Sequence, residues 1–327
     1  MENKESELKI IFAGTPEFSS VILDGIIGGS HKPALVVTTP DKPVGREGVI
    51  TESAVKVLAK KYDIPVLQPE EIKTLIYELK AIKPDLIVVT AYGQILPKEI
   101  LEIPKYGCIN LHPSLLPRWR GPSPIQYTIL NGDKKTGVTV ILMDEEIDHG
   151  PILSQREIMI AEDETGKTLC QKLAVLGARL LLETISQLER GLAKTQPQNQ
   201  QGVTYSRILN REDGKINWKK TAEGIERQVR AFELWPESFT LWQSRGKLLR
   251  IKILKVRVLK SKGSIAYPIG KVLFFPENKL CVQCGRGILS GAGDFLVIEE
   301  LQLEGKNEIT SEEFLRGYPY FINSILK

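Results

Sequence analysis

Residues 8–27, LKIIFAGTPEFSSVILDGII, decide the class of fold. The apolar run near the start predicts a buried strand, Gly-Thr-Pro predicts a turn, and the apolar spacing that follows predicts an amphipathic helix. The same order of strand and helix recurs as far as residue 190. Strands that alternate with helices form βαβ units. We therefore expect an α/β fold, with a Rossmann-like, doubly wound and mostly parallel sheet.

The first strand-to-helix turn lacks the glycines that a dinucleotide requires. A G-x-G-x-x-G pattern lets the backbone approach a pyrophosphate, and AGTPEFS offers Gly14 alone. We therefore do not expect NAD or a flavin as cofactor.

Composition and length indicate a cytoplasmic protein of two domains. The chain has 327 residues, which is long enough for two cores. Its charged N-terminus has no signal-peptide pattern, and its apolar runs are too short to span a membrane. The four cysteines are too few and too scattered for a disulfide framework. Cys281 and Cys284 have no second ligand pair nearby, so we expect no metal site.

The character of the sequence changes after residue 190. Residues 191–208 are polar and rich in glutamine, which is typical of a linker. Residues 209–327 contain one amphipathic helix and then short alternating segments broken by Gly and Pro. This pattern predicts a small OB-like β-barrel, so the expected divisions are 1–190, 191–208 and 209–327.

The second half is basic. The formal charge is −4 over residues 1–190 and +8 over the rest, and residues 238–276 hold nine Lys or Arg and no acid. Arg250 and Lys252 would share one strand face and, after a one-residue slip at Leu254, Lys255 and Arg257 another. Such a face suits a phosphate backbone, although a solvated strand face would also explain the alternation.

The stretch GCINLHP, residues 107–113, places two polar side chains at the end of a predicted strand. Side chains at i and i+2 share a face, so Asn110 and His112 point together, and Pro113 ends the pairing. Open α/β sheets bind ligands at the carboxyl ends of their strands. A lone histidine there could be an ordinary core residue, but its asparagine neighbour favours an active site.

An acid is the expected third member of this site. The loop DEEIDHG, residues 144–150, supplies four acids, and a solvated turn would explain them equally well. Asp148 lies just before a Gly-Pro step and is our first choice, with Asp144 as the alternative.

Two long motifs together resemble the signature of the folate-dependent formyltransferases: NLHPSLLPRWRG, residues 110–121, and MDEEIDHGPIL, residues 143–153. The resemblance implies a formyltransferase fold, with 10-formyltetrahydrofolate as donor and no metal. It also implies that Asn110, His112 and Asp148 are catalytic. In that chemistry Asn110 and protonated His112 stabilise the oxyanion, and Asp148 orients the imidazolium.

The resemblance further implies which residues contact folate. These are Ser114, Leu115, Leu116 and Pro117, with Asp144 placed near the pterin ring. TAYGQILP, residues 90–97, is similar to a second pterin-contacting stretch and adds Tyr92, Gly93 and Leu96. For Tyr92 and Leu96, an ordinary place in the core or at its rim is an equal alternative.

Three further segments resemble the methionyl-tRNA formyltransferases within this family: 38–46, 211–240 and 303–317. They imply that the acceptor is initiator methionyl-tRNA, that the product serves translation initiation, and that residues 209–327 bind tRNA. The expected tRNA contacts are Lys42, Arg46, Arg250, Lys252, Lys255 and Arg257. We expect a monomer.

One segment departs from the family pattern. The insertion loop reads GREGVITES, so Glu47, Val49 and Ile50 replace a basic tip. We expect the loop to approach the acceptor stem through Arg46 with less phosphate binding. Two other functions remain open: a formyltransferase or hydrolase acting on a small acceptor, and an RNA-binding protein without activity.

Overall fold

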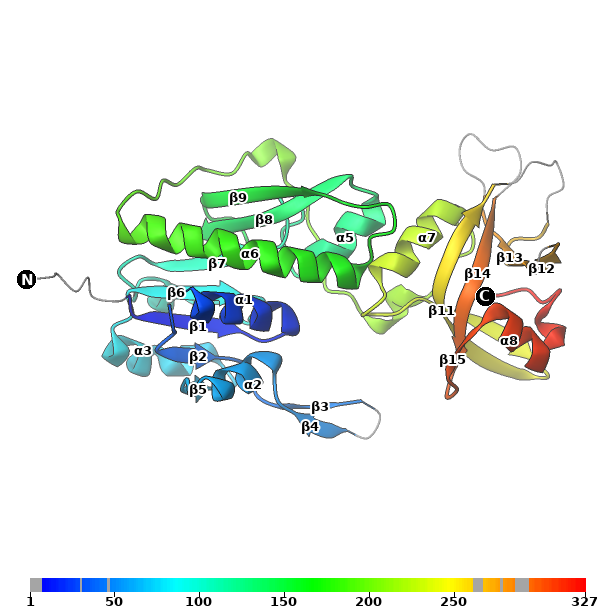
Figure 1. The fold of residues 1–327 in the computed structure, drawn as a ribbon, viewed down its shortest axis with the longest axis horizontal. Helices are drawn as coiled ribbons and strands as arrows, with labels where there is room; N and C mark the ends of the chain where they lie inside the picture. The colour runs from blue at the N-terminus through cyan, green and yellow to red at the C-terminus, as the bar shows by residue number, and fades with distance from the viewer. Residues whose placement is uncertain (1–7, 30, 46–47, 261–266, 277–278, 286–293) are drawn as a thin grey trace, which may run out of the picture. The chain divides into compact units, whose positions relative to one another are not determined.

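The protein divides into two units (Figure 1). The computed structural model describes residues 8–327 except 30, 46–47, 261–266, 277–278 and 286–293. Unit 1 comprises Met1–Pro124, Lys134–Ile160 and Leu169–Arg207, and unit 2 comprises Ile125–Asp133, Ala161–Thr168 and Ile208–Lys327.

A seven-stranded sheet in the order β5-β2-β1-β6-β7-β8-β9 forms the centre of unit 1. Its strands are β1 (Ile10–Gly14), β2 (Leu35–Val37), β5 (Val66–Leu67), β6 (Leu86–Thr90), β7 (Cys108–His112), β8 (Lys135–Leu142) and β9 (Ile152–Met159). The first five are parallel, while β8 and β9 run antiparallel to their neighbours. The sequence-based prediction of a mostly parallel sheet is confirmed.

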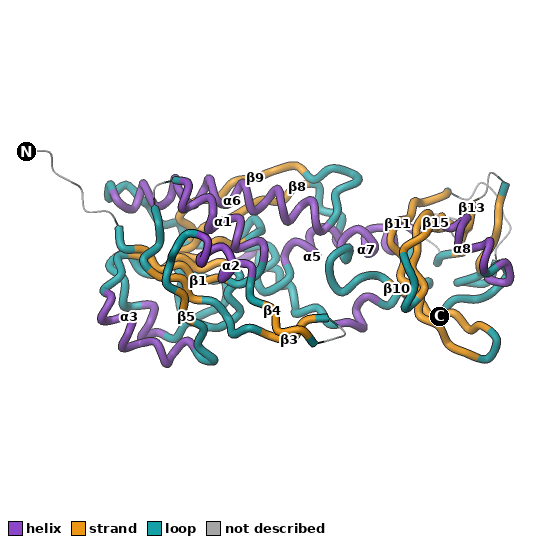
Figure 2. Tube along the Cα trace, turned by 60° about the horizontal axis from the view of Figure 1, so that its bottom comes forward, coloured by secondary structure: helices purple, strands orange, loops and turns teal. Residues whose placement is uncertain are grey.

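Helices cover both faces of this sheet. They are α1 (Glu17–Gly28), α2 (Ala54–Lys61), η1 (Ile72–Leu75), α3 (Ile76–Ile82), α4 (Lys98–Leu101), α6 (Gly166–Glu189) and η2 (Gln200–Gly202). On one face, β1, β2, β6 and Cys108 of β7 share a hydrophobic core with η1, α3 and α4. On the other, α1 and α6 run side by side, and Gly177 of α6 lies against Leu111 of β7 (Figures 1 and 2). The sheet is therefore doubly wound.

A separate ribbon joins β2 to α2. Strands β3 (Lys42–Val44) and β4 (Val49–Thr51) pair only with each other, outside the seven-stranded sheet (Figure 2). The sequence predicted a loop here. The ribbon carries the exposed side chains of Val49 and Ile50.

Unit 2 is built on a curled antiparallel sheet in the order β10-β11-β14-β13-β12, with β15 paired to β14. The strands are β10 (Phe239–Ser244), β11 (Lys247–Leu259), β12 (Val272–Phe275), β13 (Lys279–Gln283), β14 (Phe295–Leu303) and β15 (Glu308–Thr310). The helices are α5 (Pro124–Asn131), η3 (Arg211–Gly214), α7 (Ala222–Ala231), α8 (Ser311–Gly317) and η4 (Pro319–Phe321). This barrel-like architecture confirms the prediction for the second half.

Two details of unit 2 were readable in the sequence. The register of β11 against β14 shifts between Ile253 and Lys255, so the slip predicted at Leu254 is a β-bulge. Apolar residues on the inner side of β11 join a core that includes Trp242, Phe314 and Phe321. Trp242 makes edge-to-face contacts with both phenylalanines, which fixes α8 and η4 against the sheet.

The segment predicted as a linker, 191–208, is ordered against unit 1 as far as Arg207. Gln196 forms an isolated β-bridge with Ile152, and Tyr205 forms one with Arg120. Gln198 and Ser206 are buried. Polar composition predicted a linker, but it does not reveal which polar side chains find partners after folding.

Candidate active site

The carboxyl end of β7 presents Asn110 and His112 on the same face of the sheet. Ile109 and Leu111, which alternate with them along the strand, are fully buried toward the opposite face, as strand alternation predicted. Asn110 is half-buried, and His112 is only 4% exposed. A polar pair held at the end of a central strand has little freedom to move.

Asp148 completes the cluster. Its Oδ1 accepts a hydrogen bond from Asn110 Nδ2 at 3.0 Å, and its Oδ2 lies 3.4 Å from His112 Nδ1. The carboxylate is 10% exposed. The structure therefore brings together the three side chains that the sequence proposed, although Asp148 lies 36 residues beyond His112.

The surrounding backbone completes the polar contacts of the cluster. Gly121 N–H donates to Asp148 Oδ2 at 2.7 Å, and His112 Nε2 lies 2.9 Å from the Trp119 carbonyl oxygen. Both ring nitrogens of His112 thus face acceptors. An imidazolium, which has two N–H donors, would satisfy both. These backbone contacts could not be predicted from the sequence, because they depend on how the 119–121 loop folds back.

Asp144, the alternative third member, has different partners. His149 Nδ1 lies 2.7 Å from Asp144 Oδ2, and Glu146 N–H donates to Asp144 Oδ1 at 3.1 Å. Asp144 therefore orders its own loop. Of the two carboxylates, Asp148 is the one that contacts Asn110 and His112.

The predicted folate-contacting turn, Ser114–Pro117, is held rigidly through its backbone. Thr139 Oγ1 donates to the Ser114 carbonyl at 2.6 Å and lies 3.2 Å from the Leu116 amide nitrogen. Gln155 Nε2 donates to the Leu116 carbonyl at 3.0 Å. Ser114 and Leu116 are buried and Leu115 is partly exposed. Sequence reasoning missed Thr139 and Gln155. Thr139 stands out only as a polar residue within the apolar strand β8, and Gln155 lies among other polar residues of β9, so it gave no signal.

The second predicted folate stretch lies mostly in the core. Tyr92 and Leu96 are 2% and 3% exposed and belong to the same hydrophobic cluster as Cys108. Burial raises the pKa of Tyr92 to about 12, and its hydroxyl has no hydrogen-bond partner among the described residues. Gly93 adopts a φ of +89°, which favours glycine. The structure matches the core alternative for Tyr92 and Leu96, and their contact with folate stays a prediction.

The residues expected to contact tRNA on the β3–β4 ribbon are only partly visible. Lys42 is exposed on β3, while Arg46 and Glu47 lie outside the described residues. Val49 and Ile50 are 59% and 65% exposed, so the described part of this ribbon presents apolar side chains to solvent.

The basic side chains of β11 are compensated by partners from other strands. Lys252 pairs with Glu237 at 2.6 Å, and Arg257 Nε donates to Glu299 at 3.0 Å. Arg250 stacks over the Phe239 ring, with 3.6 Å from its Cζ to the centroid. Lys255 lies within 4 Å of two glutamates of β14. The stretch 238–276 has no acid in its sequence, but acids lie close to its cations in the folded chain, because Glu237 directly precedes the stretch and β14 pairs with β11.

The cysteine pair of β13 and the loop after it is buried in unit 2. Burial raises the pKa of the Cys281 thiol to about 11 and that of the Cys284 thiol to about 12. Within the described part of the chain, no group of three His, Cys, Asp or Glu side chains is arranged to hold a metal ion. Nor does that part contain a helix long and apolar enough to cross a membrane.

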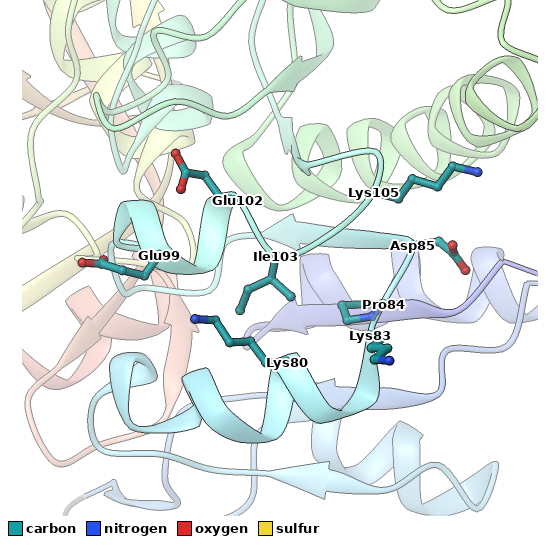
Figure 3. A pocket seen from close by; sticks show the side chains of 8 residues that line it. All are labelled: Lys80, Lys83, Pro84, Asp85, Glu99, Glu102, Ile103 and Lys105. Atoms are coloured by element: carbon teal, nitrogen blue, oxygen red, sulfur yellow. The ribbon is translucent and has the colours of Figure 1, made fainter.

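A pocket elsewhere in unit 1 lies away from this cluster. It opens between α3 and α4, and Asp85 and Lys105 at its wall precede β6 and β7 (Figure 3). It is therefore at the amino ends of the strands, whereas His112 lies at the carboxyl end. Three lysines and three acids line it: Lys80, Lys83, Lys105, Asp85, Glu99 and Glu102. This mixture of charges indicates no particular ligand.

Comparison with known proteins identifies the family. Residues 8–185 match the formyl transferase family and residues 208–319 match the formyl transferase C-terminal domain. The chain is 42% identical over 310 residues to the methionyl-tRNA formyltransferase of Thermodesulfovibrio yellowstonii, covering 94% of this chain and 95% of that protein. The chain belongs to the methionyl-tRNA formyltransferase family. The Enterococcus faecalis member is also 42% identical, over 94% of this chain and 96% of its own length.

Solved structures share the fold of this formyltransferase. WlaRD, a sugar 3N-formyl transferase, superposes with a TM-score of 0.63 at 22% identity, over 92% of this chain and 99% of that one. HypX from Aquifex aeolicus in complex with tetrahydrofolic acid gives a TM-score of 0.61 at 17% identity, over 97% of this chain and 48% of that one. At these identities the likeness concerns the fold alone.

Proposed function

We propose that the chain transfers the formyl group of 10-formyltetrahydrofolate to the α-amino group of the methionine on initiator methionyl-tRNA. The product is N-formylmethionyl-tRNA, which serves translation initiation. Relatives named methionyl-tRNA formyltransferase match nearly the whole chain, including the C-terminal domain. The observation that carries the proposed mechanism is the contact of Asp148 with both Asn110 and His112.

Asn110 is placed to stabilise the oxyanion. When the amine attacks the formyl carbon, the carbonyl oxygen gains negative charge, and donors aimed at that charge lower the barrier. Asn110 has two amide N–H groups, and one of them donates to Asp148 Oδ1. The other is available for the formyl oxygen. The bond to Asp148 fixes the orientation of the amide, so the second N–H is aimed before the substrate arrives.

We assign the proton transfers of the reaction to His112 and Asp148. The attacking amine must lose a proton, and the N10 leaving group of the folate must gain one. Asp148 can accept the amine proton and pass it to N10 as the bond from the formyl carbon to N10 breaks, while protonated His112 adds positive charge close to the oxyanion. The 3.4 Å separation between His112 Nδ1 and Asp148 Oδ2 is longer than a strong hydrogen bond. Such contacts often tighten only when substrate is bound.

The two substrates are assigned to different parts of the chain. We assign folate to the turn at Ser114–Pro117, with Asp144 near the pterin ring. We assign tRNA to the β3–β4 ribbon and to the domain at 209–327. The rigid backbone of the turn, held by Thr139 and Gln155, supports the first assignment. The exposed position of Lys42 supports the second.

The direct test is transfer of labelled formyl from 10-formyltetrahydrofolate to charged initiator methionyl-tRNA. We expect His112→Ala to abolish transfer. His31→Ala is the matched control, because His31 contacts Gly29 and Glu189 and not Asp148. If the parent chain consumes the folate without labelling the tRNA, the acceptor is a small amine or water, and the tRNA assignment is wrong.

A further inference from the structure

Residues 191–207, the last part of unit 1, hold the two loops that complete the cluster of Asn110, His112 and Asp148. One loop contains Asp148, and the other, residues 119–121, supplies the backbone groups that contact Asp148 and His112. Gln198 bonds to both loops. We propose that Gln198 is a positioning residue for formyl transfer, an inference that rests on the proposed function.

Gln198 uses both ends of its amide. Its Oε1 accepts from Arg120 Nε at 3.1 Å and from Arg120 Nη2 at 2.7 Å. Its Nε2 donates to the carbonyl oxygens of Asp148 and Gly150, each at 2.8 Å. Gln198 and Arg120 are 6% and 3% exposed, so water does not compete for these bonds. Both hydrogen bonds that the Gln198 amide nitrogen donates therefore go to the Asp148 loop.

The Asp148 loop requires such support. Asp148 adopts a φ of +51°, in the left-handed region that a residue with a side chain rarely occupies. A strained backbone of this kind persists only where its surroundings hold it. The two carbonyls that Gln198 binds lie on either side of His149, so the bonds fix the peptide units that orient the Asp148 carboxylate.

The second loop is held by the same segment. Arg120 lies between Trp119, whose carbonyl faces His112 Nε2, and Gly121, whose N–H donates to Asp148. Thr204 Oγ1 accepts from Trp119 N–H at 2.8 Å, and Ser206 N–H donates to the Arg120 carbonyl at 2.7 Å. Gln198 thus connects the loop that orients His112 with the loop that carries Asp148.

Gln198 acts through other residues and does not touch the reacting atoms. Among the described residues, its side chain bonds to main-chain oxygens of the Asp148 loop and to the Arg120 guanidinium. Loss of these bonds should displace the Asp148 carboxylate while leaving the substrate-binding residues in place. A displacement near 1 Å from the productive geometry can cost about 100-fold in rate.

The test compares Gln198→Leu with Gln201→Ala, an exposed glutamine on the same segment. We expect Gln198→Leu to lower kcat about 10- to 100-fold, with the KM of both substrates within about twofold of the parent values. Gln201→Ala should match the parent. A second readout is the ring ¹⁵N–¹H spectrum, which contains only three histidines. The His112 signal should shift in Gln198→Leu while the His31 signal does not.

Two more variants separate positioning from folding. Gln198→Leu leaves the buried Arg120 cation without its acceptor, which destabilises the fold. Gln198→Glu keeps an acceptor for Arg120 but loses the donors to the two carbonyls, so it should fold and still lose kcat. The double variant Arg120→Met with Gln198→Met removes the buried charge, and it should regain stability without regaining kcat.

Three results would overturn the proposal: a Gln198→Glu kcat within about twofold of the parent, a double variant that recovers kcat along with stability, or an unchanged His112 signal. Failure of the proposed function is distinguishable, because the parent chain itself would then not label methionyl-tRNA. In that case the His112 signal alone decides whether Gln198 positions the cluster.

Discussion

Replacing Asp148 with asparagine tests the catalytic cluster most directly. Each oxygen of the Asp148 carboxylate faces an N–H donor: Asn110 Nδ2 at 3.0 Å and Gly121 N at 2.7 Å. Asparagine has nearly the same shape but only one oxygen. In either orientation its amino group must face one of these donors, which leaves that donor unsatisfied.

The magnitude follows from these contacts. A buried donor without a partner costs about 1–3 kcal/mol, so the free energy of unfolding of unit 1 should fall by about that amount. The loss of charge beside His112 removes the proton acceptor, and acid–base groups contribute about 10²- to 10⁴-fold to rate. We expect kcat to fall within that range while the KM for folate changes little.

The assay is steady-state formyl transfer to methionyl-tRNA, with urea denaturation on the same samples. Asp144→Asn is the comparison variant, because Asp144 contacts His149 and Glu146 and neither Asn110 nor His112 in the described structure. Since Asp144 is assigned to the pterin ring, this variant should raise the KM for folate and leave kcat near the parent value. If Asp148→Asn keeps more than about a tenth of the parent kcat and Asp144→Asn loses more, the assignment of the third catalytic residue is refuted.

Three further outcomes are expected. Replacing Glu299 and Glu300 together with glutamine frees Lys255 and Arg257 of β11, so tRNA binding should tighten several-fold at low salt in a filter-binding assay. Unchanged affinity would show that this face does not contact tRNA. Trp242→Ala should lower the free energy of unfolding of unit 2 by about 3–5 kcal/mol in urea, because a buried side chain packed against two phenylalanines is lost; a loss below 1 kcal/mol would contradict the packing. Burial raises the pKa of Cys284 from 9.0 to about 12, so above pH 9 the folded chain keeps a proton that the unfolded chain releases. The free energy of unfolding should therefore fall as pH rises above 9. Cys284→Ser should weaken this pH dependence, and an identical dependence would argue against the burial.

The sequence alone determined the features that follow from local periodicity. Alternating strands and helices predicted the doubly wound sheet, because each element must bury one face. The spacing of Asn110 and His112 predicted that they share a face, because the period of a strand is two. The slip at Leu254 predicted the bulge in β11 for the same reason. Each inference needs only a few neighbouring residues.

Tertiary structure decided what depends on residues far apart in the chain. It selected Asp148 over Asp144, because only folding shows which carboxylate returns to β7. It paired the cations of β11 with acids of β14 that a linear window excludes. It also joined a polar segment to the 119–121 loop and to the Asp148 loop through the hydrogen bonds of Gln198. Hydrogen bonds of this kind join groups tens of residues apart, and a local sequence pattern does not show which distant residues will meet.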